Sequence, residues 1–71
     1  METHCVTAEG HFVQKGTTLF HSRTREIFWV MEISTEAVTL ESVTDNLEMD
    51  RTQFERQIDD QNILIESQPF G

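Results

Sequence analysis

Few side chains in this 71-residue chain have the chemistry of a metal ligand or a nucleophile. They are three histidines and one cysteine, namely His4, Cys5, His11 and His21. The histidines are seven and ten residues apart, whereas the ligand pairs that preform a zinc site are about two to four residues apart. His4 and Cys5 are neighbours that point to opposite faces of a strand, and a nucleophile needs a base held by a third group. We therefore expect no metal site, no cofactor and no enzyme activity.

Charge divides the chain into two unequal halves. Five basic residues accompany 13 acidic ones, which gives a net charge of −8. Residues 1–31 hold three of each sign, so the whole imbalance lies in residues 32–71, where two arginines accompany ten acids. Such a field repels nucleic-acid phosphates and anionic lipid. The composition is typical of salt-adapted, halophilic proteins and also of many acidic bacterial or viral proteins, and both interpretations stay open.

The start of the chain and its apolar runs predict a cytoplasmic protein. Met1 is followed by Glu2 and Thr3 rather than by a basic and apolar leader. No apolar run approaches the ~18 residues of a membrane helix, and a single cysteine excludes an internal disulfide. A chain this short buries only roughly 60% of its unfolded surface. We therefore expect a thin core, which a second copy or another partner completes.

Period-two alternation between turn residues predicts five strands. The predicted strands are residues 17–22, 27–33, 37–42, 47–49 and 63–66. The strand 27–33 is apolar on both faces, which is typical of a central strand. One of its faces carries Ile27, Trp29, Met31 and Ile33, and the other carries Phe28 and Val30. We expect the first face to point into the core.

One short helix is predicted before the last strand, from about Asp50 to Asp59. The Asp50 carboxylate can cap the first turn, and Phe54 and Ile58 are four residues apart, so they share one helix face. Asp59 and Asp60 oppose the helix dipole at the far end, which limits the helix to about two turns. We expect these two carboxylates to be solvated surface charges, and we expect Asn62 to make the turn that follows the helix.

The order of these elements resembles the small SH3-like barrels, including Tudor-like modules. The resemblance rests on Phe12-Val13 with Gly16-Thr17, the two-faced strand Ile27–Ile33, the hairpin through Asp45-Asn46 and the capped helix from Asp50. It implies a mainly β protein, a five-stranded barrel with one short helix before the last strand. The chain has no tyrosine, so the aromatic groove by which SH3 domains hold proline-rich peptides is missing. The predicted helix is also longer than the single turn usual at this point of these barrels.

The resemblance divides the chain into three parts. Residues 12–66 form the single barrel domain, and residues 67–71 form a tail. Residues 1–11 show no sustained period, so we expect a flexible segment or a short extra edge strand. The predicted core is Val13, Leu19, Trp29, Met31, Ile33, Val38, Leu40, Leu47, Met49, Phe54, Ile58, Ile63 and Ile65.

Protein binding is the function that these observations favour. Phe28 and Val30 lie opposite the predicted core face, and Leu64 lies opposite Ile63 and Ile65. Left uncovered, Phe28, Val30 and Leu64 form an apolar patch of the kind that marks association sites; the alternative is that a second wall of the barrel buries Phe28 and Val30. The uneven charge favours a basic partner or pairing with a second copy. The sequence thus predicts a small acidic regulator or adaptor that acts by binding a protein.

Nucleic-acid binding is the alternative function. Its basis is a short basic segment that holds Lys15, Arg23 and Arg25, with Phe20 interleaved. The two arginines flank the tip of a predicted hairpin and could contact phosphates, while Phe20 could stack on a base. The net charge of −8 opposes this interpretation, because phosphate-binding surfaces are usually part of a basic domain. The simpler reading is a solvated hairpin tip that protects a sheet edge.

Overall fold

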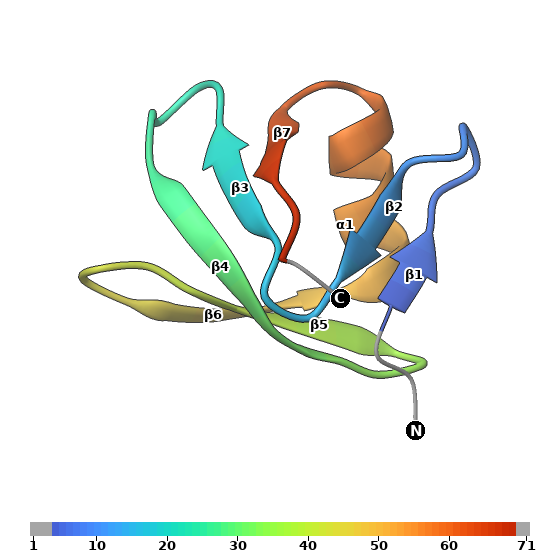
Figure 1. Cartoon of the computed structure of the whole chain (residues 1–71), viewed down its shortest axis with the longest axis horizontal. Helices are drawn as coiled ribbons and strands as arrows, with labels where there is room; N and C mark the ends of the chain where they lie inside the picture. The colour runs from blue at the N-terminus through green and yellow to red at the C-terminus, as the bar shows by residue number, and fades with distance from the viewer. Residues whose placement is uncertain (1–3, 70–71) are drawn as a thin grey trace.

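The computed structural model describes residues 4–69, which form a mainly β domain with one helix (Figure 1). Its elements are β1 (His4–Val6), β2 (Phe12–Gln14), β3 (Thr18–His21), β4 (Ile27–Ile33), β5 (Ala37–Glu41), β6 (Asn46–Asp50), α1 (Arg51–Asp59) and β7 (Ile63–Ser67). The five predicted strands and the helix before the last strand are therefore present. Residues 1–3, 70 and 71, which belong to the predicted N-terminal segment and C-terminal tail, lie outside the described residues.

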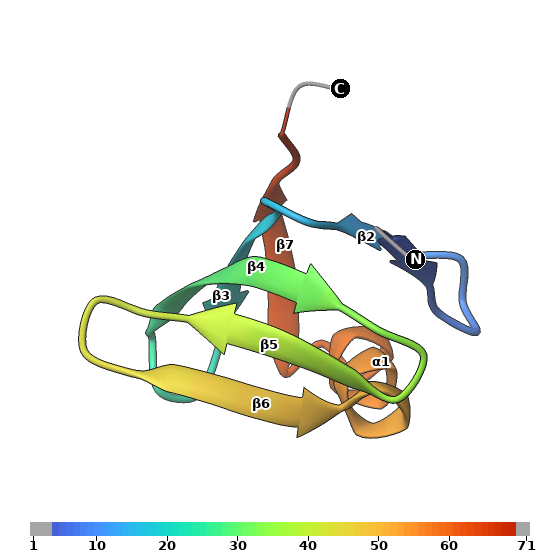
Figure 2. The same ribbon diagram turned by 90° about the horizontal axis from the view of Figure 1, so that it is seen from below.

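Five of the strands form one antiparallel sheet in the order β6-β5-β4-β3-β7. Within residues 4–69, β6 and β7 stand at the two ends of this order, and no pairing between them is found. The sheet is strongly curled, and α1 packs against β5, β6 and β7 on its concave side (Figure 2). The sheet thus has a concave inner face that holds the core and a convex outer face turned away from the helix.

The predicted faces of β4 are wrong, because Phe28 and Val30 are the residues that enter the core. They are only 8% and 1% exposed, whereas Met31 is 39% exposed and Trp29 is partly exposed on the outer face. The pairing of β4 with β5 shifts by one residue between Val30 and Glu32, which is a β-bulge at Met31. The bulge inserts one extra residue, so Ile33 returns to the inner face and is buried. A strict period of two cannot place Phe28 and Ile33 on the same face.

The rest of the core departs from the prediction at two positions, Leu47 and Cys5. Leu47 was expected to be buried, but it lies on the edge strand β6 and is 41% exposed. The buried apolar cluster is Cys5, Val13, Leu19, Phe28, Val30, Ile33, Val38, Leu40, Phe54, Ile58 and Ile63, with Met49 and Ile65 packed against it. Since Cys5 and Val13 are cross-strand partners in the β1–β2 hairpin, the N-terminal segment contributes to the core of the whole domain.

The helix α1 begins and ends by local rules. The Asp50 carboxylate accepts a hydrogen bond from the Gln53 amide at 3.2 Å, as an N-cap does. At the other end, the amides of Gln61 and Asn62 donate to the carbonyls of Ile58 and Gln57, which is a Schellman motif. Gln61 takes the left-handed conformation that this motif needs, with φ of 66°. The turn therefore centres on Gln61, whereas the sequence predicted Asn62.

No helix in the described part of the chain is long and apolar enough to cross a membrane.

Candidate protein-binding surface

Three apolar side chains lie side by side across the outer face of the sheet. Phe20 of β3 is the cross-strand partner of Ile27 on β4 and of Leu64 on β7. Directly opposed residues in antiparallel strands project from the same face of a sheet, so the three side chains form one line over β7, β3 and β4. Ile27 is 46% exposed and Leu64 is 37% exposed, while Phe20 is partly buried between them.

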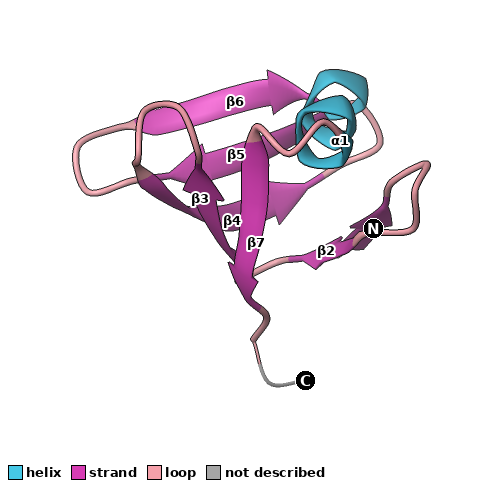
Figure 3. Ribbon diagram, turned by 90° about the horizontal axis from the view of Figure 1, so that it is seen from above, coloured by secondary structure: helices cyan, strands magenta, loops and turns pink. Residues whose placement is uncertain are grey.

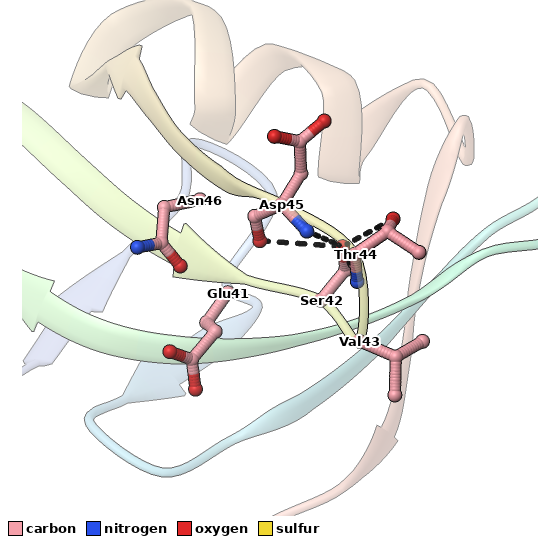
Figure 4. Close-up of a pocket in the computed structure, with 6 residues that line it drawn as sticks. All are labelled: Glu41, Ser42, Val43, Thr44, Asp45 and Asn46. Atoms are coloured by element: carbon pink, nitrogen blue, oxygen red, sulfur yellow. Dashed lines mark hydrogen bonds between the residues drawn. The ribbon is translucent and has the colours of Figure 1, made fainter.

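Val43 extends this line beyond β4. It lies in the turn between β5 and β6, is 90% exposed and lines a shallow hollow together with Ile27 and Arg25. The Ser42 hydroxyl holds the turn by accepting hydrogen bonds from the amides of Thr44 and Asp45, at 3.3 and 3.1 Å. Figure 4 shows Val43 projecting from this turn, away from the Asp45 carboxylate. We call Leu64, Phe20, Ile27 and Val43 the apolar row.

Acidic side chains occupy the neighbouring positions of the outer face. Two residues further along β4 from Ile27, Trp29 is the cross-strand partner of Glu41 on β5. The next set of cross-strand neighbours is formed by Glu32 on β4, Thr39 on β5 and Glu48 on β6, with Thr39 in the middle. The outer face is therefore apolar at one end of its strands and acidic towards the other.

The structure separates the residues that the sequence suggested for protein binding. Leu64 is exposed and belongs to the apolar row. Phe28 and Val30 are buried in the core, so they cannot contribute to an exposed patch. Their places are taken by Ile27, which was predicted to share the inward face of its strand, and by Val43, which was assigned to no element. One feature of the sequence could have identified Val43 as an exposed apolar residue: it stands directly beside a run of turn residues.

The four residues suggested for nucleic-acid binding do not converge on one surface. Arg23 and Arg25 are exposed in the β3–β4 turn, where Arg25 has a positive φ of 62°. Lys15 lies in the β2–β3 turn, at the opposite end of β3, and its ammonium is 4.0 Å from a carboxylate oxygen of Glu32. Phe20 lies within the apolar row, with Ile27 and Leu64 as its cross-strand neighbours. Only the two arginines of the hairpin tip remain close together.

A polar cluster joins the β1–β2 turn to the end of α1. His11 Nδ1 lies 2.8 Å from Asp59 Oδ1 and 3.4 Å from the Thr7 hydroxyl, and the Glu9 amide donates to Asp59 Oδ2 at 3.2 Å. Hydrogen bonds from Thr7, His11 and Glu9 lower the pKa of Asp59 below its ordinary value of 3.8, and they outweigh its desolvation, which acts in the other direction. Both contacts of the ring use the same nitrogen, whereas a nucleophile–base–acid relay uses both nitrogens. The cluster therefore has the geometry of a structural tie between two elements.

No group of three or more histidine, cysteine, aspartate or glutamate side chains within residues 4–69 lies close enough together to hold a metal ion. Comparisons of the chain with protein-family models, with curated proteins and with solved structures found no match.

Proposed function

We propose that this protein is a small, SH3-like, non-enzymatic interaction module that binds a partner protein through the apolar row. The partner is a protein surface with apolar side chains at its centre and lysine or arginine at its rim. The observation that carries this proposal is the alignment of four exposed or half-exposed apolar side chains from three strands and one turn.

The apolar row has the features of a binding centre. Leu64, Phe20 and Ile27 are held in register by the ladders of β7, β3 and β4, so little ordering is required when a partner binds. Rigid elements that present a pre-organised surface lose less entropy on association. Water gains freedom when contiguous apolar surface is covered, and exposed apolar patches on small domains are typical of association sites.

The surrounding charge favours a basic partner over a second copy. Glu41 and Glu32 flank the outer face, and the whole chain carries a net charge of −8. Two copies would bring like charges together, whereas lysine or arginine at a partner's rim would be attracted over the Debye length of about 8 Å at physiological ionic strength. Association should therefore slow as salt rises, while the apolar contact persists.

Paired variants on the outer face test the proposal. The double variant Ile27→Glu with Val43→Glu adds two negative charges to the apolar row. The control is Met31→Glu, which adds one negative charge outside the row. Met31 lies on the same strand as Ile27 and has a similar exposure. The immobilised wild-type chain and both variants are used to capture proteins from a lysate of the source cells. The proposal requires that defined proteins bind the wild type and Met31→Glu and are lost with the double variant. Equal capture by all three would refute it.

A nuclease step and a mass measurement address the other interpretations. Binding that vanishes after nuclease treatment, and also in Arg23→Glu with Arg25→Glu, would favour the nucleic-acid alternative. A dimer in light scattering that Ile27→Glu dissociates would instead make the row a contact between two copies.

A further inference from the structure

The strand β6 is the exposed edge of the five-stranded sheet. It stands at one end of the strand order, and among residues 4–69 no strand pairs with its other side. Figures 2 and 3 show β6 at the border of the sheet, with α1 close only to the end of the strand from which the helix begins. Backbone N–H and C=O groups on the free side of an edge strand are unpaired and can accept another strand.

The two faces of β6 have different chemistry. Leu47 and Met49 are paired with Leu40 and Val38, which are core residues, so they point to the concave face. Glu48 is paired with Thr39 and points to the outer face, together with Asp50. Any strand added to this edge therefore meets apolar side chains on one face and carboxylates on the other.

A hollow lies on the concave face next to this edge. Its volume is about 210 Å³, and its lining is mostly apolar. Leu47 and Met49 of β6 line it together with the buried Phe28 and Ile63. His21, which is half-buried, and Glu26, which is exposed, also line it. The side chains of an added strand that face inward would enter this space, because cross-strand partners lie on the same face.

We propose that the β6 edge binds an extended peptide segment of a partner protein, in which apolar and basic residues alternate. The backbone of the segment pairs with β6, its apolar side chains enter the hollow, and its lysine or arginine side chains lie beside Glu48 and Asp50. A second copy of this chain is a poor occupant, because two antiparallel β6 strands would bring carboxylates opposite each other on the outer face. Like charges at directly opposed positions destabilise a sheet. This surface is separate from the apolar row.

Short synthetic peptides test this inference with the intact chain. The probes are a hexapeptide of alternating lysine and valine, the same peptide with glutamate in place of lysine, and a peptide in which lysines and valines stand in two blocks. Each is titrated into the isotope-labelled protein at low salt, and amide shifts are followed by NMR. The alternating lysine peptide should shift the amides of β6 and of the hollow, whereas the glutamate and block peptides should bind at least tenfold more weakly.

Three exposed positions supply the matched variants. Glu48→Lys should weaken binding of the lysine peptide about tenfold, since an attraction becomes a repulsion at a directly opposed position, and it should admit the glutamate peptide. Leu47→Ser should weaken binding by about threefold or more, since it removes part of the apolar wall. Glu66→Lys, which makes the same charge change on β7 at the other end of the sheet, should leave the affinity within about twofold.

Four results would overturn the inference. They are no shift at millimolar peptide, shifts centred on the apolar row or β7, equal binding of the lysine and glutamate peptides, and an unchanged affinity in Glu48→Lys. Because Glu48→Lys leaves the apolar row intact, failure here does not affect the capture experiment on that row, and the two proposals fail independently.

Discussion

Truncating Phe28 should destabilise this protein much more than truncating Trp29, although Trp29 is the larger residue. The two are neighbours on β4, and Phe28 is buried in the core while Trp29 lies on the outer face. Phe28→Ala leaves a cavity among packed side chains, and such changes cost about 3–5 kcal/mol. Trp29→Ala removes only the part of the indole that its neighbours cover and leaves no cavity, so we expect about 1–2 kcal/mol.

These free energies are large for a chain of this size. At about 0.05–0.15 kcal/mol per residue, 71 residues give an unfolding free energy of roughly 4–11 kcal/mol. Phe28→Ala therefore removes about a quarter or more of the stability. One kcal/mol shifts the Tm of a domain this small by about 4–8 °C, so the Tm of Phe28→Ala should fall by at least about 12 °C.

Thermal unfolding followed by far-UV circular dichroism measures the difference, since Trp29→Ala removes the only tryptophan and with it the fluorescence signal. Met31→Ala, at the exposed bulge, is the control and should change the Tm little. If Trp29→Ala lowers the Tm as much as Phe28→Ala or more, the bulge and the assignment of faces along β4 are wrong.

Three further predictions concern α1 and its contacts. Gln61→Gly should raise the unfolding free energy by about 1 kcal/mol, because Gln61 has φ of 66° and glycine adopts this conformation without strain. The same change inside the helix, Gln57→Gly, should lower the unfolding free energy by about 1 kcal/mol. Urea titration measures both changes. Asp50→Ala should cost about 1 kcal/mol in the same assay, whereas Asp50→Asn keeps the cap and should cost little. Asp59→Asn should destabilise the protein near neutral pH. The difference in unfolding free energy between this variant and the wild type should shrink as the pH falls below 3.8, because Asp59 has a lowered pKa in the folded state. Thermal unfolding between pH 2.5 and 7 measures the difference, with Asp60→Asn as the control.

Each of these predictions has a specific contrary result. A loss of stability in Gln61→Gly would mean that the helix does not end in a Schellman motif. Equal effects of the alanine and asparagine variants at Asp50 would mean that the carboxylate does not cap the helix. A difference between Asp59→Asn and the wild type that stays constant down to pH 2.5 would mean that the carboxylate is not held ionised by Thr7, His11 and Glu9.

The candidate binding surface could be predicted only in part. Leu64 was found from the alternation of the last strand, because an apolar residue opposite two core residues must point outward. Ile27 was missed because the alternation of β4 does not say which of its two apolar faces is covered. Val43 was missed because it lies in the turn between β5 and β6, outside any strand alternation. The choice between the two faces of β4 depends on where α1 and the β1–β2 hairpin pack, and both are brought to the sheet by contacts between residues distant in the sequence.

The sequence by itself determined the local elements of this protein. Strand positions, the Asp50 cap and the Phe54–Ile58 helix face follow from turn residues, alternation and spacing, which act over a few neighbouring residues. It also determined the charge imbalance of the second half, which no folding can change. The tertiary structure alone decided that the indole of Trp29 faces outward, that the bulge at Met31 returns Ile33 to the core, and that Cys5 is buried. The physical reason is that burial depends on which surfaces meet, and a strand apolar on both sides takes its inner face from the helix and hairpin packed against it.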